Sequence, residues 1–284
     1  MRRACVLAIL VAAMALALLA APVRNIGAQQ ASPTAGPSLR FTTTVTVDGR
    51  RLGLTCVGSG SPTVVLVGGL RFPAEDVWPT IVDAVSPVTR VCAFDRAGLG
   101  PSDPQPRSPQ TAADVVADLH AALAAAGETG PYVPVGFSLG GLFARLYAST
   151  YPAEMAGLVL VDAFPPGFYG PLAEPDPGMA APIDFFVSES QVVVAPLPPP
   201  MPAVVIVAGT ADPLYIPPGT VPLWFTLQER QAQDLGARTV TAEESGHLVP
   251  LDQPEVVVTA IEDVVAAARD PSSWATPAAA TPAP

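Results

Sequence analysis

The sequence has few of the residues that usually hold metal ions. Its 284 residues include two histidines and three cysteines, with no Cys-x-x-Cys spacing. Structural zinc sites use four such side chains at short, characteristic spacings. We therefore expect no metal, and no residue pattern implies an organic cofactor.

Basic residues are scarce as well. The chain carries 14 Lys and Arg against 25 Asp and Glu, a formal net charge of −11 at pH 7. An acidic surface repels phosphate backbones and anionic lipid head groups. This argues against nucleic-acid binding and against peripheral membrane binding.

The N-terminal segment has the layout of a secretory signal peptide. Residues 1–28 begin with Arg2 and Arg3, continue through an 18-residue Ala/Leu-rich run and reach small residues near Ala28. We expect a leader and an exported protein, periplasmic or extracellular, with no stable membrane association once the leader is cleaved. An uncleaved N-terminal membrane anchor is the alternative, because 18 apolar residues can just span a bilayer.

The remaining chain is expected to form one domain between two disordered terminal segments. Residues 29–41 are predicted to be a disordered linker, and residues 270–284, mostly Ala, Thr, Pro and Ser, a disordered tail.

Cys56 and Cys92 lie in the domain, residues 42–269. In an oxidising compartment such a pair commonly forms a disulfide, and two buried thiols are the alternative. Oligomeric state is left open.

Short Val-rich runs alternate with helical patterns through this domain. This alternation predicts an α/β fold, with a mostly parallel sheet covered by helices on both faces. An Asp48-Gly49 hairpin supplies an antiparallel N-terminal edge. Residues 164–202 interrupt the alternation with eleven prolines and are predicted to form a short, irregular Pro-rich cap. The strands are expected at 42–57 (two), 63–69, 90–95, 132–137, 157–163, 203–209 and 237–242, and the helices near 74–86, 111–126, 139–151, 220–235 and 255–269.

Ser138 is the candidate nucleophile. The sequence G-F-S-L-G at residues 136–140 follows a predicted strand and opens a predicted helix. That context is typical of a nucleophile elbow, where a strained turn projects the serine above the sheet. A plain strand-to-helix glycine turn is the alternative.

A serine hydroxyl needs a base, and the base needs an orienting acid. His247 lies in a loop after the last predicted strand and is favoured over His120, which lies within a predicted helix. For the acid, Asp212 follows the strand at 203–209 and is favoured, while Asp162 ends the preceding strand and is the alternative. The expected oxyanion donors are the backbone amides of Leu70 and Leu139.

These motifs together resemble the α/β-hydrolase superfamily over residues 42–268. FDRAGLGPSD at 94–103 is similar to the loop after the family's fourth strand, and SGHLVPLDQP is similar to its histidine loop. Asp95 and Arg96 are expected to brace the first of these loops. Gly68 departs from the family, many members of which carry histidine there. The resemblance implies an eight-stranded sheet whose second and fourth strands are neighbours, which would bring Cys56 close to Cys92.

The resulting hypothesis is a secreted serine hydrolase that cleaves carboxylic esters through an acyl-enzyme. Aromatic residues of the cap suggest a small-molecule substrate with an apolar group, although they could equally cover the core: Phe164, Phe168, Tyr169, Phe185 and Phe186. The fold also hosts amidases, thioesterases, acyltransferases, C–C hydrolases and cofactor-free peroxidases. A binding or sensor protein with little turnover is the alternative from another class.

Overall fold

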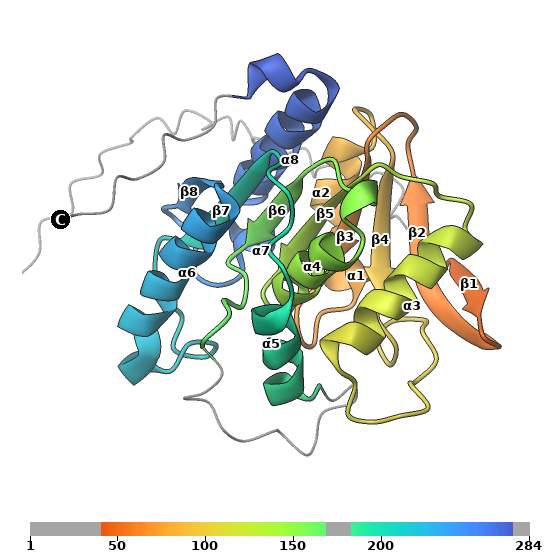
Figure 1. Cartoon of the computed structure of the whole chain (residues 1–284), viewed down its shortest axis with the longest axis horizontal. Helices are drawn as coiled ribbons and strands as arrows, with labels where there is room; N and C mark the ends of the chain where they lie inside the picture. Colours follow the sequence, from red (N-terminus) through yellow and green to blue (C-terminus); the bar gives the residue numbers. More distant parts are fainter. Residues whose placement is uncertain (1–40, 169–182, 275–284) are drawn as a thin grey trace, which may run out of the picture. The chain divides into compact units, whose positions relative to one another are not determined.

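A single eight-stranded sheet organises the chain (Figure 1). We describe it from a computed structural model, in residues 41–168 and 183–274. The strand order is β1-β2-β4-β3-β5-β6-β7-β8, which confirms the predicted sheet. The strands are β1 Thr44–Val47, β2 Arg50–Val57, β3 Thr63–Val67, β4 Val91–Asp95, β5 Tyr132–Phe137, β6 Leu158–Val161, β7 Ala203–Ala208 and β8 Arg238–Ala242.

The N-terminal edge of this sheet is antiparallel. Asp48 and Gly49 both have positive φ, 48° and 76°, as a two-residue hairpin turn between β1 and β2 requires. Strand β2 then pairs antiparallel with β4 and places Cys56 directly opposite Cys92. All later pairings are parallel.

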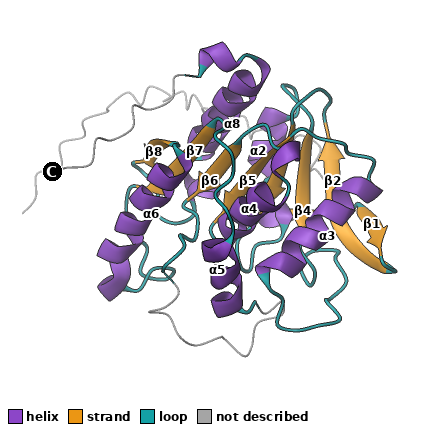
Figure 2. Ribbon diagram, viewed as in Figure 1, coloured by secondary structure: helices purple, strands orange, loops and turns teal. Residues whose placement is uncertain are grey.

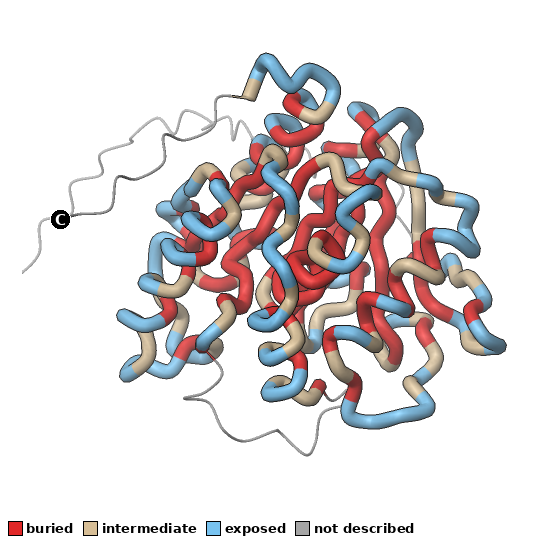
Figure 3. The backbone as a smooth tube through the Cα atoms, in the orientation of Figure 1, coloured by how far each residue is buried: buried red, intermediate tan, exposed pale blue. Residues whose placement is uncertain are grey.

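Helices cover both faces of the sheet (Figure 2). The central strands are buried (Figure 3). Successive side chains of a strand point to opposite faces of the sheet, so they divide between two core clusters, one on each face. Val65 and Val67 of β3 pack with α3 (Ala112–Ala125) and α4 (Leu139–Thr150), whereas Val64 and Leu66 pack with α2 (Pro79–Val85) and α8 (Pro254–Arg269). The helices are α1 Ala74–Val77, α2 Pro79–Val85, α3 Ala112–Ala125, α4 Leu139–Thr150, α5 Phe185–Val194, α6 Val221–Leu235, α7 Val249–Asp252 and α8 Pro254–Arg269.

The segment predicted as an irregular cap contains a helix. Asp184 caps α5 by accepting a hydrogen bond from the Val187 amide at 2.9 Å. The Ala112 amide, at the start of α3, donates to Ser188 Oγ at 2.9 Å. A capped ten-residue helix therefore forms between the prolines and docks on α3. Tyr169 lies outside the described residues.

Ordered structure also extends past both predicted domain boundaries. Phe41, predicted to lie in the linker, is 3% exposed. Residues Pro271–Ser273 form a short 3-10 helix, and the Arg238 guanidinium lies 3.6 Å from the ring centroid of Trp274. An aromatic side chain next to each boundary therefore anchors the chain to the domain.

The predicted leader, residues 1–28, lies outside the described residues. Within residues 41–168 and 183–274, no helix is both long and apolar enough to cross a membrane.

Candidate active site

Ser138 occupies a strained turn between β5 and α4. Its φ and ψ are 54° and −124°, a region that residues with a side chain rarely adopt. The neighbouring glycines make this turn possible. A Cβ at Gly136 would lie 2.5 Å from the Gly140 carbonyl oxygen, and a Cβ at Gly140 would lie 2.2 Å from that of Val67. The predicted elbow geometry is therefore present.

His247 lies beside this serine. Its Nε2 is 2.9 Å from Ser138 Oγ, and its Nδ1 is 2.6 Å from Asp162 Oδ2. The imidazole is 3% exposed and packs against the rings of Phe137 and Tyr215, with centroids 5.2 and 4.8 Å away. The other histidine, His120, instead contacts Glu154 Oε1 at 3.0 Å and stacks on Tyr151.

The acid that contacts His247 is Asp162, not the favoured Asp212. Asp162 directly follows β6, which pairs with the serine-bearing β5. Asp212 lies beyond β7, one strand further away, and its Oδ1 accepts a hydrogen bond from the Leu214 amide at 2.9 Å. The expectation that Asp212 would meet the histidine is corrected, because strand order places the end of β6 nearer to Ser138.

Two residues that sequence reasoning did not identify hold Asp162 in place. Trp224 Nε1 donates to Asp162 Oδ1 at 3.2 Å, and Gln228 Nε2 contacts the same oxygen at 3.4 Å. The Ala208 amide adds a third donor at 3.3 Å. Asp162 is fully buried, and a buried carboxylate requires such partners. Both side chains come from α6, whose sequence carries no motif.

The loop after β3 lies against the nucleophile. A Cβ at Gly69 would be 3.1 Å from Ser138 Cβ, so the backbone leading to Leu70 passes beside the serine. Gly68 is required by the tight turn, because its Cβ would meet the Phe72 carbonyl oxygen at 2.5 Å. A histidine at this position would therefore clash with that oxygen unless the turn changed. Leu139, the first residue of α4, supplies one of the N-terminal helix amides that have no acceptor within the helix.

Asp95 and Arg96, at the end of β4, contact the segment that follows β3. The Ala74 amide, at the start of α1, donates to Asp95 Oδ1 at 2.7 Å, and burial raises the pKa of Asp95 to about 6. Arg96 donates to the Leu70 carbonyl oxygen, and burial lowers the pKa of Arg96 to about 10. Both side chains therefore contact backbone between Leu70 and the start of α1, a different segment from the 94–103 loop that they were expected to brace.

The cap aromatics divide between core and surface. Phe168 is 1% exposed and packs edge-on against Trp224, with the centroids 4.8 Å apart, and Phe164 packs against both rings. Phe186 is instead 69% exposed. Phe164 and Phe168 thus cover the helix that supports Asp162.

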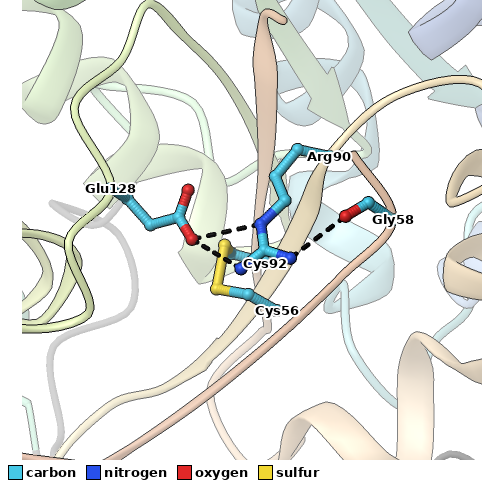
Figure 4. The surroundings of a disulfide bond; sticks show 5 residues. All are labelled: Cys56, Gly58, Arg90, Cys92 and Glu128. Carbon is cyan, nitrogen blue, oxygen red and sulfur yellow. Dashed lines mark hydrogen bonds and ion pairs between the residues drawn. A yellow bond between two sulfur atoms is a disulfide. The ribbon is translucent and has the colours of Figure 1, made fainter. Parts of the chain in front are cut away.

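Cys56 and Cys92 form the disulfide at the antiparallel edge, with an S–S distance of 2.07 Å (Figure 4). Glu128 lies beside it and pairs with Arg90, whose other nitrogen donates to the Gly58 carbonyl oxygen. The two sulfurs and the Glu128 carboxylate lie within 4.8 Å of one another. Because the sulfurs are bonded to each other, this group does not offer thiolates to a metal.

Comparison with known proteins agrees with this architecture. A family model described as alpha/beta hydrolase fold matches residues 62–185. A thermophilic esterase from Thermogutta terrifontis superposes with a TM-score of 0.58 at 21% identity, covering 80% of this chain and 98% of that one. The enol-lactonase of Burkholderia xenovorans LB400 has a TM-score of 0.58 at 19% identity, with coverages of 79% and 100%.

Curated relatives match over shorter segments. An uncharacterized protein of Schizosaccharomyces pombe is 34% identical over 147 residues, which are 42% of this chain and 27% of that protein. The chain thus aligns with only about a quarter of that relative's length. Together with the sheet order, the family model over residues 62–185 and the solved structures show that the chain has the alpha/beta hydrolase fold.

Proposed function

We propose that this protein is an exported serine hydrolase that cleaves carboxylic esters through an acyl-enzyme. The single observation that carries the proposal is the continuous hydrogen-bonded series Asp162–His247–Ser138, with distances of 2.6 and 2.9 Å. A serine, a histidine and a buried acid in this order form the constellation that activates a hydroxyl for acyl transfer.

In the proposed reaction, Ser138 Oγ attacks the ester carbonyl carbon while its proton passes to His247 Nε2. The negative charge on the former carbonyl oxygen would be held by the Leu70 and Leu139 amides. As the C–O bond breaks, the imidazolium returns the proton to the leaving alcohol. Water then attacks the acyl-enzyme and loses its proton to the same nitrogen, releasing the carboxylic acid and restoring the serine. Asp162 holds the imidazole in the required tautomer throughout.

The relatives lend general support to an ester substrate. Two solved neighbours of this fold are named an esterase and an enol-lactonase, although a shared fold alone does not determine chemistry. The disulfide is consistent with the proposed export, because such bonds persist in oxidising compartments. The ring of Tyr215 packs against His247 and against the ring of Phe72. These aromatic rings near the reacting groups favour a substrate with an apolar group.

A fluorophosphonate probe tests the proposal directly. The wild-type protein should label rapidly and hydrolyse p-nitrophenyl acetate or butyrate, and Ser138→Ala should do neither. Ser59→Ala, which removes an exposed serine from the loop between β2 and β3, is the matched control and should behave as wild type. A folded wild type that neither labels nor turns over any p-nitrophenyl ester from C2 to C12 would favour a binding protein instead. Hydrolysis of anilides in preference to esters would favour an amidase.

A further inference from the structure

A cavity is lined by residues of α4, α5 and α6, three helices that lie on the same side of the sheet (Figure 1). Its volume is about 420 Å³, within the range of cavities that bind small molecules. Neither Ser138 nor His247 lines it. We call it the α4–α6 cavity, lined by Arg145, Val192, Leu227, Arg230, Gln231 and Asp234 among others.

Its polar groups are unusual for an acidic protein. Arg145 has a side chain only 8% exposed, and its nearest carboxylate oxygen, on Asp234, is 3.6 Å away. Arg230 is a second cation on the wall. Two guanidinium groups against one carboxylate give the cavity a positive excess, although the whole chain has a net charge of −11. Within the described residues the contact with Asp234 is the one ion pair of Arg145, and so long a contact leaves guanidinium donors for an anion.

Gln231 adds an unmet acceptor. It is 1% exposed, and its Oε1 has no hydrogen-bond partner among the residues that the structure describes. Its Nε2 donates to Gln228 Oε1 at 3.3 Å, so that end of the amide is already used. A buried amide oxygen without a donor is costly. That oxygen has almost no accessible surface in this structure, so a molecule in the cavity reaches it only after the Gln231 side chain rotates.

The remaining wall is apolar. Val192 from α5 and Leu227 from α6 line the cavity. On α6, Leu227, Arg230, Gln231 and Asp234 follow the three- and four-residue spacing that places side chains on one helix face. The apolar wall and the polar groups thus lie along the same strip.

We propose that the α4–α6 cavity binds a small carboxylate that has an apolar chain and a hydroxyl group close to the carboxylate. The carboxylate pairs with Arg145 and Arg230, the chain lies along Val192 and Leu227, and the Gln231 side chain rotates so that its Oε1 accepts from the hydroxyl. This site is separate from the Ser138 site and does not depend on the proposed hydrolysis.

Isothermal titration with 3-hydroxyoctanoate tests the site. The wild-type protein and Ser138→Ala should bind one equivalent with the same affinity, because the cavity does not include the serine. Arg145→Met and Gln231→Leu, which keep similar volumes, should each weaken binding at least about tenfold. Arg230→Ala changes an exposed residue and provides a second test if Arg145→Met does not fold. Arg107→Ala removes an exposed arginine that does not line the cavity, and it should leave affinity unchanged.

Two further probes separate the parts of the proposal. Octanoate lacks the donor and 1,3-octanediol lacks the charge, so both should bind several-fold more weakly. The proposal is overturned if wild type binds no 3-hydroxyoctanoate at millimolar concentration, if the cavity variants bind as tightly as Arg107→Ala, or if the diol binds as tightly as the acid. Loss of binding in Ser138→Ala would also overturn it, by placing the probe at the elbow.

Discussion

At the scale of single residues, Asp162 has the most constrained environment in the site. One carboxylate oxygen contacts His247 Nδ1 and the other accepts from two side chains and a backbone amide. A fully buried carboxylate with four partners is held in one orientation. Asp212 is half-buried, and its carboxylate closes a local turn. The two candidate acids therefore differ sharply in what their removal should do.

We predict that Asp162→Asn lowers kcat for p-nitrophenyl esters by about 10³- to 10⁴-fold, because an amide cannot hold the same histidine tautomer or stabilise the imidazolium. Asp212→Asn keeps an oxygen for the Leu214 amide and should change kcat by less than about threefold, since no reacting group depends on it. Steady-state kinetics of the two variants decide the matter. A large loss in Asp212→Asn with little loss in Asp162→Asn would reverse the assignment.

A second residue-scale prediction concerns stability and pH. Burial raises the pKa of Asp95 from 3.8 to about 6, so between these values the folded state binds more protons than the unfolded state. Its contribution to stability therefore falls as pH rises from about 4 to 6, and the penalty is complete above that window. Asp95→Asn keeps an acceptor for the Ala74 amide without the charge. It should be more stable than wild type at pH 8 by roughly 2–3 kcal/mol.

Urea unfolding at several pH values checks this, because the advantage of Asp95→Asn should vanish near pH 4. Asp103→Asn is the contrasting control. The Asp103 pKa is lowered by its hydrogen bonds with Arg51, so any pH-dependent effect of that substitution should have the opposite sign. An Asp95→Asn protein that is no more stable than wild type at pH 8 would show that the buried charge costs nothing.

At the scale of secondary-structure elements, α6 positions the acid. We predict that Trp224→Phe lowers kcat about tenfold with little change in KM, because it removes a donor to Asp162 while preserving most of the packing. Trp78→Phe is a matched control. Its indole nitrogen is buried with no partner among the described residues, and it packs on the opposite core cluster. Equal kcat values in the two variants would mean that the hydrogen bond from Trp224 to Asp162 does not contribute to the reaction.

The strands, the elbow, the acid and helix α5 differ in how far the sequence predicts them. Short Val-rich runs bounded by turn residues predict strands such as β3 and β6, because β-branched residues favour extended backbone and strands of a covered parallel sheet are apolar on both faces. The elbow was readable from Gly136, Ser138 and Gly140. The acid was not, because Asp162 and Asp212 both follow parallel strands. In the structure, Asp162 follows the strand next to β5, and side chains of α6 hold its carboxylate. Helix α5 was missed because prolines surround it, while the docking of Ser188 on α3 depends on residues distant in sequence.

At the scale of the whole molecule, the disulfide joins the antiparallel edge to the parallel sheet. It links β2 to β4 across 36 residues of chain that include β3 and two helices. Cross-linking a loop of this length restricts the unfolded chain and should contribute about 3–4 kcal/mol to the free energy of unfolding. We predict that Cys56→Ser/Cys92→Ser lowers the urea midpoint accordingly.

Catalysis should respond differently from stability. Ser138, Asp162 and His247 follow β5, β6 and β8, all beyond β3 from the disulfide in the strand order. The double variant should therefore retain kcat within about twofold at temperatures well below its unfolding midpoint, because the strands that position the reacting groups remain paired. Dithiothreitol should lower the wild-type midpoint to that of the double variant and leave the variant unchanged. Equal midpoints for oxidised wild type and double variant would mean that pairing of β2 with β4 alone maintains this edge. A large loss of kcat in the folded variant would mean that the edge and the site are coupled through β3.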